Sequence, residues 1–205
     1  MTKAKQKFDK TIARCEELIE LYNTIEKKQL SNVKPRHDIL RAAIVLAVAA
    51  FDAYATDCFS EQFVEYIKKH KVDESLQKLL IDAGFDVKFS LELINSDRPY
   101  RKIRTLIDRH YAKYTTQKLE VINQLFLQYR IKDITNNAAK KTGKNPDRII
   151  SSVKKLVERR HSIVHDGDYN EYCKIKPVSA SDINRIHDLK LLVDNMDEII
   201  LNKMK

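Results

Sequence analysis

The segment Ala42-Ala-Ile-Val-Leu-Ala-Val-Ala-Ala-Phe51 is the longest apolar run in the chain. It begins directly after Arg41 and ends at Asp52, so charged residues bound it on both sides. A run of this length is too short to cross a bilayer and predicts a helix that is buried on most of its sides. This helix is expected to span residues 37–69. From Phe51 at the end of the run, Ala55, Phe59 and Phe63 continue one of its faces.

The composition favours an all-α fold. Only 3 glycines and 4 prolines occur, which is few for a fold rich in strands or loops. Residues that favour helices dominate the rest of the sequence. A chain of 205 residues is long enough to bury one sizeable core, so a single domain over residues 1–205 is expected.

Apolar residues recur at helical spacing in four long segments, which predicts four core helices. They are expected at about 5–28, 37–69, 146–165 and 180–203. The third has a clear start, because Asn145 can cap it, Pro146 fits its first position and Asp147 places an acid in its first turn. Ser179 or Ser181 is expected to cap the fourth helix.

The middle third, about residues 72–143, predicts a variable region of several shorter helices. Gly84 is expected to end one of them, and Pro99 fits the first turn of another. The segment 136–147 is polar and rich in lysine, which predicts an exposed connection. Residues 31–35 are expected to form a loop.

The net charge of +9 is compatible with a polyanionic partner such as RNA, and equally with a basic soluble surface. The cysteines, Cys15, Cys58 and Cys173, have neither the spacing of a metal site nor that of a disulfide framework. The N-terminus is polar and lacks the features of a signal peptide, so a cytoplasmic protein is expected. No glycine-rich phosphate loop occurs, and no cofactor is predicted.

The segment Glu158-Arg-Arg-His-Ser-Ile-Val-His-Asp-Gly-Asp168 interrupts the apolar pattern of its own helix. At about 100° per residue, Arg160 falls inside the expected apolar stripe and His161 lies on its edge. An arginine in such a place must be buried with a partner or presented to an anion. The expected stripe consists of Ile149, Val153, Leu156 and Val164.

Arg160 and His165 have the chemistry that RNA cleavage through its own 2′-OH requires. Histidine can transfer a proton near neutral pH, and arginine carries a planar charge that matches a phosphate. A spacing of five residues separates the two side chains by roughly 140° on a straight helix. They therefore converge only if the helix loosens near Gly167 or if a second copy packs against it. Alternatively, the arginine pairs with a core carboxylate and the histidine caps the helix end.

Asp52 lies on an apolar face of its own helix, as Arg160 does, and carries the opposite charge. A pair between them, within or between subunits, is a hypothesis that fits both positions. His161 and His165 are four residues apart and could instead bind a metal together with Glu158 or Asp166.

A second group of interest lies in the middle third, where tyrosines alternate with basic residues. Such a group could stack on single-stranded RNA and neutralise it, or could be a solvated helix face. Its aromatic members are Tyr100, Tyr111 and Tyr114. Its basic members are Arg98, Arg101, Lys102, Arg104, Arg109, His110 and Lys113.

The sequence Arg160-His-Ser-Ile-Val-His165 resembles the R-x4–6-H motif of HEPN domains. The apolar helix that leads into Asp52 resembles the central helix of the RiboL-PSP branch of these domains, and Gly167, just past the histidine, also fits. The close match covers about a quarter of the chain. It implies a HEPN-like helical bundle with additional helices in its middle third, which forms a homodimer so that the motifs of two subunits face each other.

The resemblance also implies an activity. Many HEPN proteins are metal-independent endoribonucleases that act as toxins or in phage defence. Carried over to this sequence, Arg160 and His165 would be the catalytic pair, His161 the polar residue after the arginine, and Asp52 the acidic residue of the second helix. The expected product is a 2′,3′-cyclic phosphate.

Some HEPN toxins pair with a nucleotidyltransferase antitoxin that modifies a tyrosine two residues after the histidine. That position is Gly167 here. Other HEPN domains only bind RNA or dimerise, which is the alternative for this chain. A purely structural helical domain is a third hypothesis.

Overall fold

The computed structural model describes residues 1–27, 36–112 and 118–204. Within these ranges it contains nine helices and no strand, which confirms the all-α prediction. An isolated antiparallel bridge between Tyr169 and Ile175 is the one β feature of the described residues. The predicted loop at 31–35, and Lys113 and Tyr114 of the tyrosine group, lie outside the described residues.

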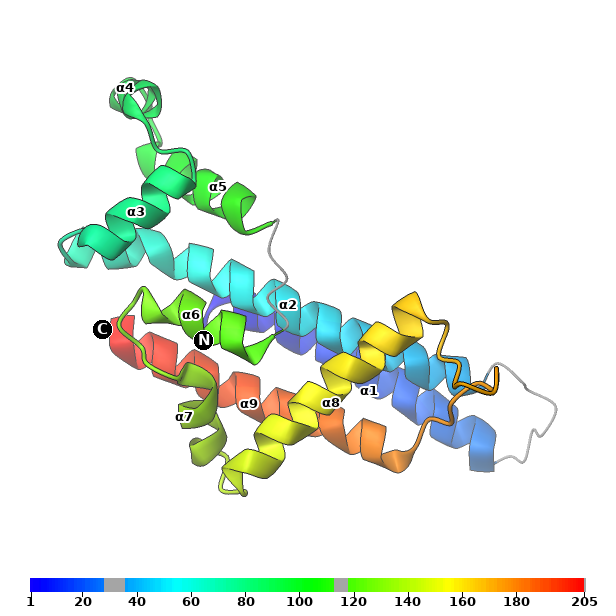
Figure 1. Ribbon diagram of the computed structural model, residues 1–205. Helices are drawn as coiled ribbons and strands as arrows, with labels where there is room; N and C mark the ends of the chain where they lie inside the picture. Colours follow the sequence, from blue (N-terminus) through cyan, green and yellow to red (C-terminus); the bar gives the residue numbers. More distant parts are fainter. Residues whose placement is uncertain (28–35, 113–117, 205) are drawn as a thin grey trace.

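Four long helices form the bundle: α1 (Lys3–Lys27), α2 (Arg36–Lys69), α8 (Pro146–His165) and α9 (Ala180–Met204). They correspond to the four predicted core helices. In Figure 1, α2 runs back along α1, and α8 crosses the bundle obliquely. Helix α9 packs against α8 and against the hairpin of α1 and α2.

Helix α2 is central because it packs against α1, α5, α8 and α9. Residues 37–69 would pass as a membrane span by length and hydropathy, but 56% of their most apolar window is buried inside the protein. The apolar surface of α2 therefore has protein partners. The fully buried positions include Ala43, Ala47, Phe51, Ala55 and Phe59.

The start of α8 agrees with its prediction. The Asn145 side chain accepts a hydrogen bond from the backbone N–H of Arg148 at 3.1 Å, and Pro146 occupies the first turn. At the other end one assignment was wrong, because Val164 is 47% exposed whereas Ile163 is packed against the core. Ile163 lies seven residues after Leu156, two full turns on, and so continues the same side of the helix.

The start of α9 is set by Ser179 and Asp182. The Asp182 carboxylate accepts a hydrogen bond from the backbone N–H of Ser179 at 3.0 Å. The backbone N–H of Asp182 donates to the Ser179 carbonyl at 2.9 Å. Of the two serines proposed as caps, Ser179 therefore makes these bonds at the first turn.

The middle region forms five short helices: α3 (Glu74–Asp82), α4 (Val87–Ile94), α5 (Pro99–Tyr111), α6 (Leu119–Leu127) and α7 (Ile134–Lys141). Helices α3, α4 and α5 form an arm at the end of α2, with α4 farthest from the bundle (Figure 1). Gly84 follows α3 with a φ of +100°, and Pro99 begins α5, as predicted.

The expectation of an exposed connection over 136–147 was wrong for its first half, because residues 136–141 belong to helix α7. Ala138 and Ala139 are fully buried, together with Ile134, on the side that meets α8 and α9. Lysines and asparagines surround these alanines in the sequence, so the sequence shows no apolar stripe at this helix. Small side chains allow α7 to pack closely without a long apolar stripe.

Candidate functional site

Arg160, His161 and His165 all lie on the last turns of α8. Arg160 is half-buried, and its Nε atom is buried with no hydrogen-bond partner. His161 and His165 are exposed, and their ring centroids lie 4.4 Å apart at an interplanar angle of 38°. The helix thus presents two neighbouring imidazoles to solvent, and the side chain of Arg160 on the same turns is partly buried.

Helix α8 keeps its regular path through the motif. The backbone N–H of Asp166 still donates to the carbonyl of Ser162 at 3.0 Å, four residues earlier. The helix therefore does not loosen before His165. The five-residue spacing then leaves the side chains of Arg160 and His165 roughly 140° apart. One copy of α8 does not direct them to one point, and this leaves packing against a second copy as the way to combine them.

The buried ion pair at this end of α8 belongs to Arg159. The carboxylate of Asp168 is almost fully buried, and Arg159 approaches its Oδ1 with one guanidinium nitrogen at 2.5 Å. Arg41 donates from Nε to Oδ2 at 2.6 Å. Two cations from two helices therefore share one carboxylate, and this ties α2, α8 and the following loop together.

Asp52 is a half-buried residue of α2. The salt bridges among the described residues include none between Asp52 and Arg160, so the structure does not bring these two together within one chain. The acidic partner found at this end of α8 is instead Asp168, and the arginine is Arg159. Pairing of Asp52 with Arg160 between subunits stays a prediction.

Sequence reasoning missed Arg41, Arg159 and Asp168. Two signals were present, since Arg41 directly precedes the apolar run and Asp168 follows the turn residue Gly167. Neither signal says where the loop folds. The structure shows that both arginines also donate to the carbonyl of Lys176, Arg41 at 2.6 Å and Arg159 at 3.2 Å.

The loop after α8 begins with a left-handed turn. Gly167 has a φ of +62° and Asp168 a φ of +64°. A Cβ atom at Gly167 would lie 3.2 Å from Cε2 of Tyr169, which is a close contact. The chain then forms a small hairpin, in which the backbone N–H of Asn170 donates to the Lys174 carbonyl at 2.9 Å. The turn favours glycine at position 167, and it brings the carboxylate of Asp168 back to Arg159 on α8.

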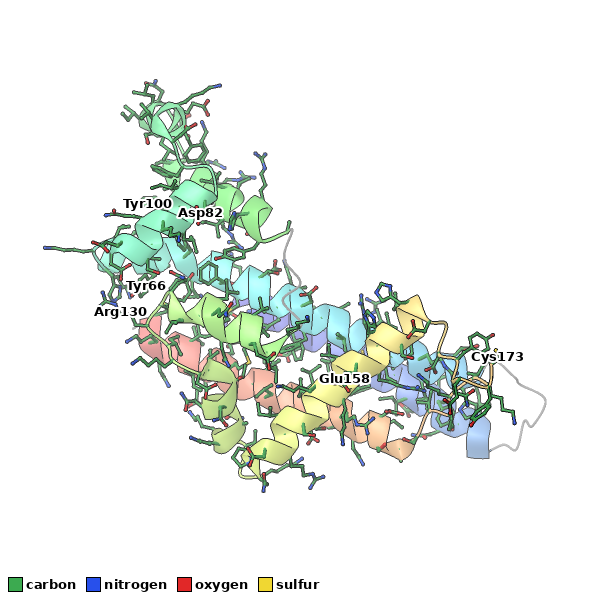
Figure 2. The ribbon with its side chains drawn as sticks, in the orientation of Figure 1. Tyr66, Asp82, Tyr100, Arg130, Glu158 and Cys173 are labelled. Carbon is green, nitrogen blue, oxygen red and sulfur yellow. The ribbon has the colours of Figure 1, made fainter. Side chains whose placement is uncertain are left out.

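Several exposed apolar side chains lie at the end of α8 and in the hairpin that follows it. Figure 2 shows Cys173 in the hairpin beyond α8 and Glu158 on α8 itself. Monomeric proteins seldom leave several large apolar side chains exposed together. We call this set the 164–175 apolar surface; it comprises Val164, Tyr169, Tyr172 and Ile175, and Tyr172 is the most exposed of them at 72%.

The metal hypothesis required a third ligand beside His161 and His165. Over the described parts of the chain, no three His, Cys, Asp or Glu side chains are grouped closely enough to hold a metal ion. Glu158 and Asp166, which were considered as third ligands, are both exposed.

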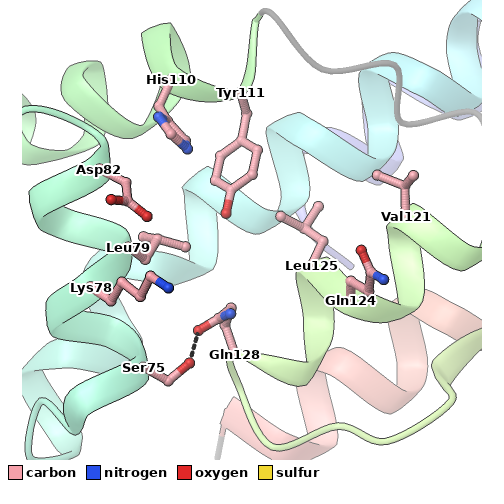
Figure 3. Close-up of a pocket in the computed structure, with 10 residues that line it drawn as sticks. All are labelled: Ser75, Lys78, Leu79, Asp82, His110, Tyr111, Val121, Gln124, Leu125 and Gln128. Carbon is pink, nitrogen blue, oxygen red and sulfur yellow. Dashed lines mark hydrogen bonds between the residues drawn. The ribbon is translucent and has the colours of Figure 1, made fainter.

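A separate pocket of about 340 Å³ lies between α3, α5 and α6. Figure 3 shows its polar lining, which includes a hydrogen bond from Ser75 Oγ to Gln128 Oε1 of 2.6 Å. Its lining residues do not include Arg160, His161 or His165. It therefore does not belong to the site at the end of α8.

An all-helical bundle with this arginine and histidine at the end of a crossing helix has the features of a HEPN domain. Residues 9–202 match the RiboL-PSP-HEPN family, and the chain belongs to this family. We find no significant match among curated proteins or among solved structures. The family match extends over the arm and the bundle alike, far beyond the quarter of the chain that carries the recognisable motifs.

Proposed function

We propose that this protein is a metal-independent endoribonuclease whose active site is composed of residues from two copies. The observation that carries the proposal is the end of α8, whose last turns carry a half-buried arginine and two exposed, neighbouring histidines. Membership of the RiboL-PSP-HEPN family supports ribonuclease activity as the reaction class.

In the proposed reaction the RNA supplies its own nucleophile. The 2′-oxygen forms a bond to phosphorus while the bond from phosphorus to the 5′-oxygen breaks. A histidine takes the proton of the 2′-OH, and a protonated histidine gives a proton to the departing 5′-oxygen. His165 fills one of these roles. The products are a 2′,3′-cyclic phosphate and a free 5′-OH.

Arg160 would stabilise the negative charge that accumulates on the pentacovalent phosphate. Its buried Nε has no hydrogen-bond partner, and the salt bridge at this end of α8 among the described residues is made by Arg159 instead. His161 would assist on the same face as His165, since the two rings lie side by side. We assign Asp52 the role of orienting Arg160 from across the subunit interface.

The homodimer is part of the proposal for two reasons. The regular path of α8 keeps Arg160 and His165 apart within one chain, and a symmetric pair of helices can combine an arginine from one copy with a histidine from the other. The 164–175 apolar surface, at the end of α8 and in the hairpin after it, would be covered by such a partner.

For the cellular setting we propose a cytoplasmic toxin or phage-defence nuclease that acts on RNA. A dedicated inhibitor would then be needed, either a nucleotidyltransferase-type antitoxin or another kind. Gly167 occupies the position at which some HEPN toxins carry the modified tyrosine. This favours an inhibitor that acts by another route.

The alternative is a HEPN domain that binds RNA or dimerises without cleaving. The exposed apolar surface and the net charge of +9 would suit such a module equally well. It would retain RNA binding that weakens with salt and does not depend on His165.

The deciding experiment is cleavage of labelled single-stranded RNA by the purified protein in excess EDTA. Arg160→Ala and His165→Ala are compared with His187→Ala, an exposed histidine of α9 that serves as a control. Circular dichroism and light scattering first show that all variants keep the fold and assembly of the wild type. Loss of cleavage in both site variants, with His187→Ala unaffected, supports the nuclease. No cleavage by the wild type supports the binding module.

A further inference from the structure

A groove of about 400 Å³ runs between α4 and α5 on the arm. It belongs to a different part of the chain from the end of α8, and in Figure 2 Tyr100, at the start of α5, lies far from Cys173. The groove is lined by Phe89, Glu92, Ser96, Arg98, Arg101, Lys102, Thr105, Leu106 and Arg109.

Four of the lining side chains are basic and one is acidic. Arg98, Arg101 and Arg109 are exposed, and no salt bridge among the described residues involves them. By contrast, Arg104 on the same helix lies 3.9 Å from the carboxylate of Asp108. The groove thus concentrates arginines that have no carboxylate partner, which is the charge distribution of a site for an extended anion.

The spacing of the arginines fits a linear polyanion. Arg98 directly precedes α5, and Arg101 and Arg109 lie on the same face of that helix. The rise of a helix places Arg98 and Arg109 roughly 16 Å apart. A guanidinium can donate two parallel hydrogen bonds to one phosphate. The half-buried side chains of Phe89 and Leu106 add an apolar floor, against which flat bases can rest.

We propose that the groove between α4 and α5 binds the phosphate backbone of single-stranded RNA. It would hold a long substrate at a second place, away from the histidines of α8. The proposal takes the identity of the polyanion from the proposed function. An acidic protein segment would be attracted by the same charges, but alternation of phosphates with flat bases matches both the arginines and the apolar floor.

The test uses the full chain carrying His165→Ala, so that RNA is not consumed. Affinity for a labelled, unstructured RNA is measured by fluorescence anisotropy over a range of salt concentrations. The arm variant is Arg101→Glu with Arg109→Glu. The control is Lys10→Glu with Arg14→Glu on α1, which makes the same change of net charge at exposed positions. Circular dichroism establishes that both variants are folded.

We expect the arm variant to lose at least about tenfold in affinity, and the slope of log affinity against log salt to fall by roughly 1.4 for two lost phosphate contacts. The control should change little. Equal losses in both variants, or unchanged binding by the arm variant, would overturn the proposal. A variant with Lys at both arm positions should recover most of the salt slope.

A second readout separates this proposal from the nuclease itself. With His165 restored, the arm variant should show a higher KM on long RNA and an unchanged kcat. Wild-type protein that binds RNA through the arm without cleaving it would refute the nuclease and leave the arm site standing. Cleavage with a normal KM in the arm variant would leave the nuclease standing and refute the arm site.

Discussion

Adjacent arginines on α8 have different surroundings. Arg159 is paired with the buried carboxylate of Asp168, whereas the salt bridges of the described residues include none to its neighbour Arg160. One arginine thus fixes the end of the helix, and under the proposed function the next one acts on RNA. Sequence alone did not separate these roles, because the loop that brings Asp168 back has no periodic pattern.

At Arg160, substitution by lysine tests whether the planar charge is needed. We expect Arg160→Lys to lower kcat for RNA cleavage by about 10²–10³-fold, since a lysine keeps the charge but not the fork of donors. Single-turnover kinetics with saturating enzyme measure this effect. If the variant keeps the wild-type kcat, Arg160 has a structural role and does not act in the reaction.

Removal of the Asp168 carboxylate should be the most damaging single change at this end of the bundle. Asp168→Ala leaves two arginines buried without their shared anion, and we expect a loss of about 3–5 kcal/mol in the free energy of unfolding. Urea denaturation measures it, with the exposed neighbour Asp166→Ala as the control. If both variants unfold at the same urea concentration, the ion pair contributes little.

At the scale of the element, Gly167 is the residue that ends α8 and starts the loop. Because its φ is +62° and an added Cβ would lie 3.2 Å from the Tyr169 ring, Gly167→Ala should destabilise the protein by about 1–2 kcal/mol. Thermal unfolding gives the value. Gly143→Ala is a useful comparison, because it has a φ of +72° but nothing within 4 Å of the added atom. A larger loss at Gly143 would contradict the role of the contact.

The three cysteines differ in their burial. Burial raises the pKa of the Cys15 thiol to about 11 on α1, and burial also raises the pKa of Cys58 on α2. Both thiols therefore stay protonated at pH 8, below their pKa values, whereas Cys173 is exposed in the hairpin. We expect one thiol per chain to react rapidly with a disulfide reagent at pH 8, and all three in denaturant. Rapid reaction of two thiols in the native protein would contradict the burial of α1 or α2.

The sequence located the long helices well because each carries a continuous apolar stripe and several begin with recognisable caps. It failed at α7, whose buried side includes two alanines, and at Val164, which lies at the end of a helix where the covering neighbours stop. It did not find the pairing of Arg159 with Asp168, because a helical wheel shows which face a charge occupies but not which loop reaches that face. The arginine–histidine motif could be recognised in the sequence, whereas the residues around it depend on tertiary contacts.

At the scale of the whole molecule, the composite site can be tested by mixing two inactive proteins. In a mixed dimer of Arg160→Ala and His165→Ala, one of the two sites receives an intact arginine from one subunit and an intact histidine from the other. With random exchange of subunits we expect about a quarter of the wild-type activity to return. Cleavage of RNA after mixing and incubation measures it, and each variant alone provides the background.

No recovery, with exchange of subunits confirmed by differently labelled proteins, would mean that each site uses an arginine and a histidine of the same chain. Under that outcome α8 would have to deform when RNA binds.

The position of α9 has a consequence for how the protein is made. Helix α9 covers α8 and closes the bundle, yet it is translated after α8 and after the loop that holds Asp168. At about 5–20 residues per second, the ribosome needs a few seconds more to add it. Throughout that interval the nascent chain lacks one of the helices against which α8 packs. We therefore expect a chain still attached to its ribosome to be harmless to the messenger that encodes it.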